Sequence, residues 1–177
     1  MVFISEGLAM TRVMGVSAYT VALAACIWRW WRSGQSQSRD AVFGVLAVVQ
    51  LALVLDMIFN LRWKLHEFFM DEAMAHGVYG LRRLPQLLAL VLLVGAAAMG
   101  CGWMVLRLRH RPGAAIAVGG TVLSVALRCV EVLSYHYLDA VLYLTIGKMM
   151  MVSILWIGLT GLTCVGAWMD GRSRDYI

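Results

Sequence analysis

A polar segment between two apolar runs contains the side chains of this sequence that are best suited to chemistry. It runs from Arg128 to Asp139, reads RCVEVLSYHYLD, and is followed by Lys148. A charged residue inside a bilayer costs about 2.5–3.5 kcal/mol on insertion scales, so charges in such a position mark a functional site by default. We therefore expect the rest of the chain to hold these groups in a defined arrangement.

The first chemistry that these residue types allow is acid–base or nucleophilic catalysis. His136 would act as the base or nucleophile, Asp139 would orient its ring, and Arg128 would hold an anionic group of the substrate. The catalytic pair would then be His136 and Asp139, and the substrate a lipid or another phosphate-containing molecule. No known catalytic motif accompanies these residues, so a small membrane enzyme is one hypothesis among three.

The second chemistry, which we favour, is an outward-facing polar pocket within the membrane that binds or passes a small polar or anionic ligand, a proton or a lipid headgroup. Carboxylates and His136 can exchange protons, and guanidinium groups attract anions. A transporter, a channel and a receptor all fit this hypothesis. The ligand-binding candidates are the polar residues that the predicted topology brings to one end: Asp56, Asn60, Arg128, Glu131, Tyr135, Lys148, Arg82, Arg83 and Gln86.

Metal binding has the weakest support in the sequence. Glu72 and His76 lie one helical turn apart, and His66 and His136 are the other candidate ligands. The sequence contains neither an HExxH motif nor paired cysteines with metal-ligand spacing. No particular metal or other cofactor follows from these residues.

The composition shows what kind of protein must position these groups. The chain has 177 residues, of which 62% are hydrophobic and 14% charged. Soluble domains have about 45–50% apolar and about 25% charged residues, so this is the composition of a membrane protein. The net charge of +5 comes from arginines scattered in short loops, not from a basic face with interleaved aromatics, so nucleic acid is not an expected partner.

Five apolar runs are long enough to cross a bilayer, which requires about 20 residues each. The sequence therefore predicts an all-α integral membrane protein, a single polytopic domain over residues 1–177 without a separate soluble domain. The connection 61–83 alternates charged and apolar residues at helical spacing, and we expect an amphipathic helix there. The predicted spans cover about 13–31, 41–60, 84–106, 114–133 and 140–168.

The first apolar run has a second interpretation. Leu23-Ala24-Ala25-Cys26 is similar to a bacterial lipoprotein cleavage box. Directly after it, however, comes the basic aromatic cluster from Trp28 to Arg32, which suits a span that ends at a cytoplasmic interface. We favour a span over a processed signal peptide.

The distribution of cations predicts the orientation. Five spans place the termini on opposite sides, and the positive-inside rule assigns the more basic short segments to the cytoplasm. That favours an outside N-terminus and a cytoplasmic C-terminus, in a bacterial inner membrane. The inner cations are Arg29, Arg32, Arg39, Arg107, Arg109, Arg111, Arg172 and Arg174, and the outer ones are Arg12, Arg62, Lys64, Arg82 and Arg83.

This topology brings the ligand-binding candidates together at the outer end and predicts no comparable ionisable set at the inner end. Asp56 and Asn60, four residues apart, are expected to share one helix face. Because an unpaired charge in hydrocarbon is costly, we predict an Asp56–Arg128 contact and a Glu131–Lys148 contact. Such pairs could line a pocket, or they could only fix the helix register.

The third hypothesis is a structural subunit of a larger membrane complex or a homo-oligomer. Small residues four apart allow helix backbones to approach closely in a bilayer. Two stretches carry this pattern, Gly95–Gly102 and Ala115–Gly119. They are the predicted docking surfaces for partner subunits.

Overall fold

The computed structural model describes residues 2–33, 41–76, 83–133, 136–146 and 149–174. Five of its helices are long and apolar enough to cross a membrane, over Met10–Ser33, Ala41–Phe59, Pro85–Met104, Pro112–Leu133 and Met151–Arg172. This confirms an all-α helical bundle of the membrane type. The elements are α1 (Val2–Ser33), α2 (Ala41–Phe59), α3 (Leu61–Ala75), α4 (Arg83–Arg107), α5 (Pro112–Leu133), α6 (His136–Leu142), β1 (Thr145–Ile146), β2 (Met149–Met150) and α7 (Met151–Arg174).

The last span begins later than the sequence predicts. The apolar run from Ala140 is not one helix, because α6 ends at Leu142 and a short antiparallel pair, β1 and β2, precedes α7. The backbone N–H of Met151 donates to the carbonyl of Leu144 at 2.9 Å, which closes this turn. Hydropathy cannot separate a short apolar hairpin from a helix, and β-branched residues such as Thr145 and Ile146 lower helix propensity.

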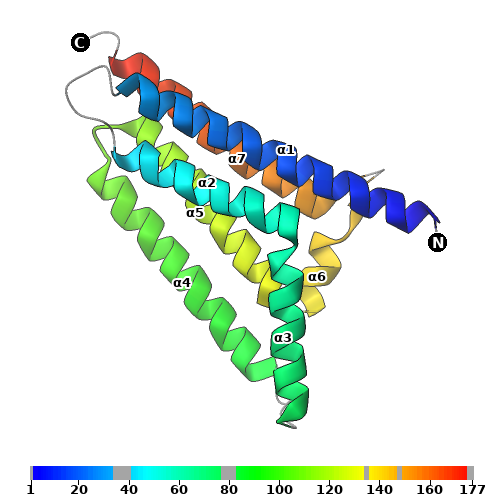
Figure 1. Cartoon of the computed structure of the whole chain (residues 1–177). Coiled ribbons are helices and arrows are strands. Elements are labelled where there is room, and N and C mark those ends of the chain that lie inside the picture. Colours follow the sequence, from blue (N-terminus) through cyan, green and yellow to red (C-terminus); the bar gives the residue numbers. More distant parts are fainter. Residues whose placement is uncertain (1, 34–40, 77–82, 134–135, 147–148, 175–177) are drawn as a thin grey trace.

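The long helices alternate in direction (Figure 1). α1, α4 and α7 finish at one end of the bundle, which we call the Arg29 end, and α2 and α5 begin there. α2 and α5 finish at the opposite end, which we call the Arg128 end. α3, which occupies the place of the predicted amphipathic connection, extends from this end, and α6 lies there as well.

α5 and α7 form the closest helix pair, because glycines remove the side chains between them. A Cβ on Gly120 would lie 2.8 Å from the carbonyl oxygen of Leu159, and one on Gly166 would lie 2.4 Å from the backbone nitrogen of Ala117. The contact face therefore includes Ala117 and Gly120. Gly119, which belongs to the predicted docking face, has open space around its Cβ position.

The buried residues of the core form two apolar clusters, and they also include polar side chains. At the Arg29 end, Cys26 and Phe43 are fully buried, and at the Arg128 end Tyr19 and Trp156 are. Gln50 is also fully buried, and its side-chain amide donates to the Thr121 hydroxyl at 3.0 Å. That hydrogen bond satisfies the amide N–H and ties α2 to α5, as polar side chains do between membrane helices.

α4 differs from the other long helices. None of the residues in its span is buried within the bundle, and it packs mainly on α5. Figure 1 shows it on the outside of the bundle, at an angle to α1 and α7. Cβ positions on Gly95, Gly100 and Gly102 meet nothing within 4 Å. The predicted docking face on this helix is thus open, and its partner stays a prediction.

Candidate functional site

The predicted Asp56–Arg128 contact is confirmed. Arg128 lies near the end of α5, and one of its terminal nitrogens donates to the carboxylate of Asp56 on α2. Its other terminal nitrogen donates to Glu131, one turn further along α5, at 2.8 Å. The side chain of Arg128 is 6% exposed and that of Glu131 is 0% exposed. Charges this deep require partners, and the two contacts provide them.

Trp156 completes this cluster from α7. Its indole N–H donates to the second carboxylate oxygen of Glu131 at 2.9 Å. The guanidinium carbon of Arg128 also lies 5.4 Å from the centre of the Trp156 ring, within the range of a cation–π interaction. The Arg128 cluster, defined as Asp56, Arg128, Glu131 and Trp156, therefore connects α2, α5 and α7.

A cavity of about 830 Å³ adjoins the Arg128 cluster. Its walls are mostly aliphatic, and Asp56, Lys64 and Arg128 are the charged residues among its lining. The buried Nε of Arg128 has no hydrogen-bond partner among the described residues. Arg128 thus borders the cavity while its two terminal nitrogens are bound to carboxylates.

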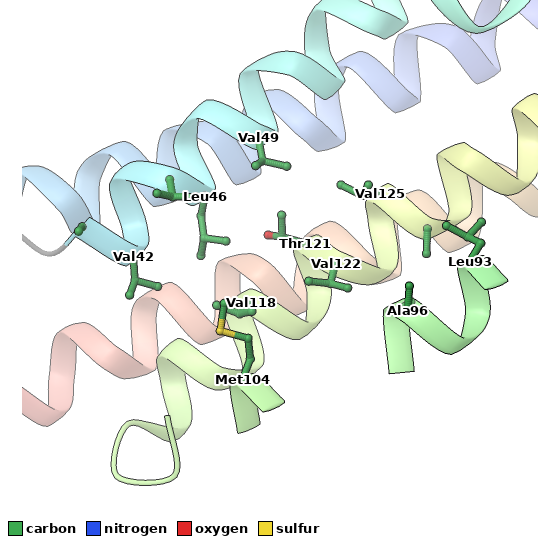
Figure 2. Close-up of a pocket in the computed structure, with 14 residues that line it drawn as sticks. Val42, Leu46, Val49, Leu93, Ala96, Met104, Val118, Thr121, Val122 and Val125 are labelled. Carbon is green, nitrogen blue, oxygen red and sulfur yellow. The ribbon is translucent and has the colours of Figure 1, made fainter. Parts of the chain in front are cut away.

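A second cavity of about 560 Å³ lies between α2, α4 and α5 (Figure 2). Val42, Leu46 and Val49 of α2 project toward it, and Val118, Val122 and Val125 of α5 form the opposite wall. α4 contributes Leu93, Ala96 and Met104. Val49 and Val125 line both cavities, so the cavities adjoin, and we refer to the two together as the groove. Its charged lining residues belong to the cavity near the Arg128 end.

Asn60 does not share a helix face with Asp56, so that prediction is wrong. α2 ends at Phe59, and Asn60 adopts the left-handed conformation with a φ of 52°. Asparagine tolerates this conformation better than most residues. Asn60 therefore makes the turn into α3 instead of extending the surface of α2.

Gln86 has a structural contact at the Arg128 end. Its side-chain amide donates to the carbonyl of Leu133, the last residue of α5, at 3.0 Å. This bond satisfies one of the carbonyls that a helix C-terminus leaves open. It ties the start of α4 to the end of α5, beside the cluster and not within the lining of the groove.

The candidate metal ligands include one pair in contact. Glu72 and His76 are in contact at 2.9 Å, but both side chains are exposed. No group of three or more His, Cys, Asp or Glu residues that could hold a metal ion occurs among the residues that the structure describes. Asp139 is half-buried on the short α6, which begins at His136.

Several candidate residues cannot be placed. Tyr135, Lys148 and Arg82 lie outside the described residues, so the predicted Glu131–Lys148 contact stays a prediction. Backbone positions alone are described for His66 on α3, Arg83 on α4 and His136 on α6.

The Arg29 end contains a buried ion cluster that the sequence did not predict. Asp170 on α7 accepts hydrogen bonds from Arg29 on α1 at 2.7 Å and from Arg111, just before α5, at 2.9 Å. Asp170 and Arg29 are both nearly inaccessible, and Arg29 also stacks over Phe43. The expectation that this end has no comparable ionisable set is therefore wrong. The available signal was Asp170, an acid at the end of the last apolar run, next to the cations that follow it.

These features define a class of protein: a polytopic α-helical membrane protein with a buried ion cluster at each end of its bundle and a groove. The groove is lined by α2, α4 and α5 and, at its charged end, by α2, α3 and α5. Comparison of the chain with family models, with curated proteins and with solved structures gave no match. Function is accordingly inferred from the geometry and chemistry of the site.

Proposed function

We propose that the groove binds one lipid-like amphiphile, with its apolar chain between α2, α4 and α5 and its polar head beside Arg128. One observation supports this most directly. The two cavities share Val49 and Val125, and charged lining residues occur only in the cavity at the Arg128 end, among the described residues. A groove with this polarity is complementary to a molecule that has a long apolar part and one polar end.

The dimensions and the donors of the groove support an amphiphile. Volumes of about 560 and 830 Å³ fall within the range of about 300–1,000 Å³ that ligand pockets have. The exposed Lys64 can donate hydrogen bonds to phosphate or carboxylate oxygens of a headgroup, next to the guanidinium charge of Arg128. A small, wholly polar ligand would leave the aliphatic walls of the groove without a complementary partner.

We also propose that the Arg128 end faces the outside and the Arg29 end the cytoplasm of a bacterial inner membrane. The described residues at the Arg29 end include seven arginines, namely Arg29, Arg32, Arg107, Arg109, Arg111, Arg172 and Arg174. The positive-inside rule places such segments in the cytoplasm. The headgroup end of the groove would then open in the outer leaflet.

The test is native mass spectrometry of the protein purified in a mild detergent, with lipids identified after gentle activation. Ala96 on α4 lines the groove, whereas Ala98, two residues later, does not belong to its lining. Ala96→Trp fills the apolar cavity and is expected to lower the lipid-bound fraction roughly tenfold, the factor that corresponds to 1.4 kcal/mol. Ala98→Trp is the matched control and is expected to retain the lipid.

The polar end is tested with Lys64→Gln, because Lys64 is exposed and its replacement leaves the buried ion pairs intact. We expect this variant to bind less of an anionic lipid and an unchanged amount of a neutral one. A wild-type protein without bound lipid, or equal retention by Ala96→Trp and Ala98→Trp, would contradict the proposal.

A further inference from the structure

A repeated pattern occurs at the Arg29 end of the bundle, away from the groove. Each helix that finishes there, α1, α4 and α7, has a tryptophan near its end and an arginine four residues later. In each pair the guanidinium carbon lies over the indole ring, at 5.6 Å, 5.1 Å and 4.5 Å from its centre. We call these pairs the Trp–Arg belt: Trp28 with Arg32, Trp103 with Arg107, and Trp168 with Arg172.

The belt is exposed on the surface of the bundle. Trp28 is 44% exposed, Trp103 54% and Trp168 51%, although all three lie in the apolar stretches that can cross a membrane. Exposed indoles at the ends of such spans lie at the membrane–water interface, where the ring is in contact with lipid. Whatever the belt binds must therefore be in the bilayer itself, which argues against a soluble protein or a nucleic acid.

The charge at this end favours an anionic partner. Within the described residues of the Arg29 end, the acidic side chain is Asp170, which is buried and bound to Arg29 and Arg111. The belt arginines are exposed, and a guanidinium group over an aromatic ring can also donate hydrogen bonds to a phosphate. A surface depression of about 680 Å³ beside Trp28, Trp31 and Arg32 provides space for a headgroup.

We infer that the Trp–Arg belt binds acidic phospholipids, with the lipid phosphate on the arginines and the acyl chains against the tryptophans. The three pairs end three different helices, which Figure 1 shows finishing at one end of the molecule. The bundle therefore presents several anion-binding positions in one leaflet. This inference does not depend on the groove or on its ligand.

The test uses indole fluorescence, to which the three belt tryptophans contribute together with Trp30, Trp31, Trp63 and Trp156. The protein is reconstituted into vesicles of equal parts phosphatidylglycerol and phosphatidylcholine, with bromine, a quencher of indole fluorescence, on the chains of one lipid or the other. The composition of the bilayer is the same in both samples. We expect brominated phosphatidylglycerol to quench more strongly, consistent with an enrichment of about two- to fivefold next to the belt, and we expect high salt to reduce the difference.

The matched variants separate the belt from general surface charge. The triple variant Arg32→Gln, Arg107→Gln, Arg172→Gln keeps all tryptophans and is expected to be quenched equally by both brominated lipids. Arg12→Gln removes an exposed cation on α1 at the opposite end, outside the lining of the groove, and is expected to keep the wild-type preference. If the triple variant does not purify as a helical protein, the three single variants are compared, and each is expected to lose part of the preference. Equal quenching of the wild-type protein, or a preference that persists in the arginine variants, would overturn the inference.

Discussion

Arg128 and Asp170 are the residues on which most of the buried charge converges, one at each end of the bundle. Arg128 bridges two carboxylates, and Asp170 bridges two guanidinium groups. The two clusters fix the relative positions of α1, α2, α5 and α7 because a separated charge would remain in an apolar environment. Removal of Arg128 or Asp170 should therefore lower the stability of the protein more than removal of one of their partly exposed partners.

Asp170→Ala is expected to destabilise the protein by about 3–5 kcal/mol, because it leaves the nearly inaccessible Arg29 without its carboxylate. Arg111→Ala should have a smaller effect, since the side chain of Arg111 is 27% exposed and water can replace part of the interaction. Thermal unfolding in detergent, followed by circular dichroism, measures both. Equal effects of the two variants would show that Asp170 is not the centre of the cluster.

At the level of the elements, the position of α7 against α5 depends on glycines that let the two backbones approach. Gly120 lies at this contact, whereas its neighbour Gly119 faces open space. The two residues share a helix and a local sequence, so they respond alike to any change in helix propensity. They differ in what a side chain would meet.

Gly119→Ala should be neutral or stabilise the protein by about 0.5–1 kcal/mol, as expected when alanine replaces a helical glycine. Gly120→Ala should instead destabilise it by about 1–3 kcal/mol, because the new methyl group would overlap the carbonyl of Leu159. Unfolding curves of the two variants under the same conditions give the difference. If Gly120→Ala were as stable as Gly119→Ala, the close packing of α5 on α7 would be incorrect.

At the level of the whole molecule, the alternating helices give the two ends different surfaces. The Arg29 end exposes arginines and tryptophans, whereas acidic residues accompany the cations on α3 at the Arg128 end. This asymmetry is the basis of the proposed orientation.

Reporter fusions can measure that orientation. A green fluorescent protein fused after Ile177 should fluoresce, because that end is expected in the cytoplasm, and an alkaline phosphatase at the same position should be inactive. Fusion of the same reporters after His76, near the end of α3, should give the opposite pair of results. Active phosphatase at Ile177 would reverse the proposed topology, and with it the leaflet assigned to the Trp–Arg belt.

The sequence by itself determined that this is a helical membrane bundle with five spans. The length and hydropathy of each run decide whether it crosses a bilayer, and only a helix satisfies its own backbone there. The Asp56–Arg128 contact was also predictable, because a charge in hydrocarbon needs a partner and the topology placed these two at the same end.

Only the tertiary structure decided the rest. Arg29 and Asp170 are 141 positions apart, and nothing local to either residue specifies that α1 and α7 finish side by side. The groove depends on the angle of α4 against α5, and the turn at Asn60 depends on a backbone conformation that hydropathy does not report. Membrane insertion is a property of each segment separately, whereas ion clusters and cavities arise from side chains of several helices that meet only when the bundle is packed.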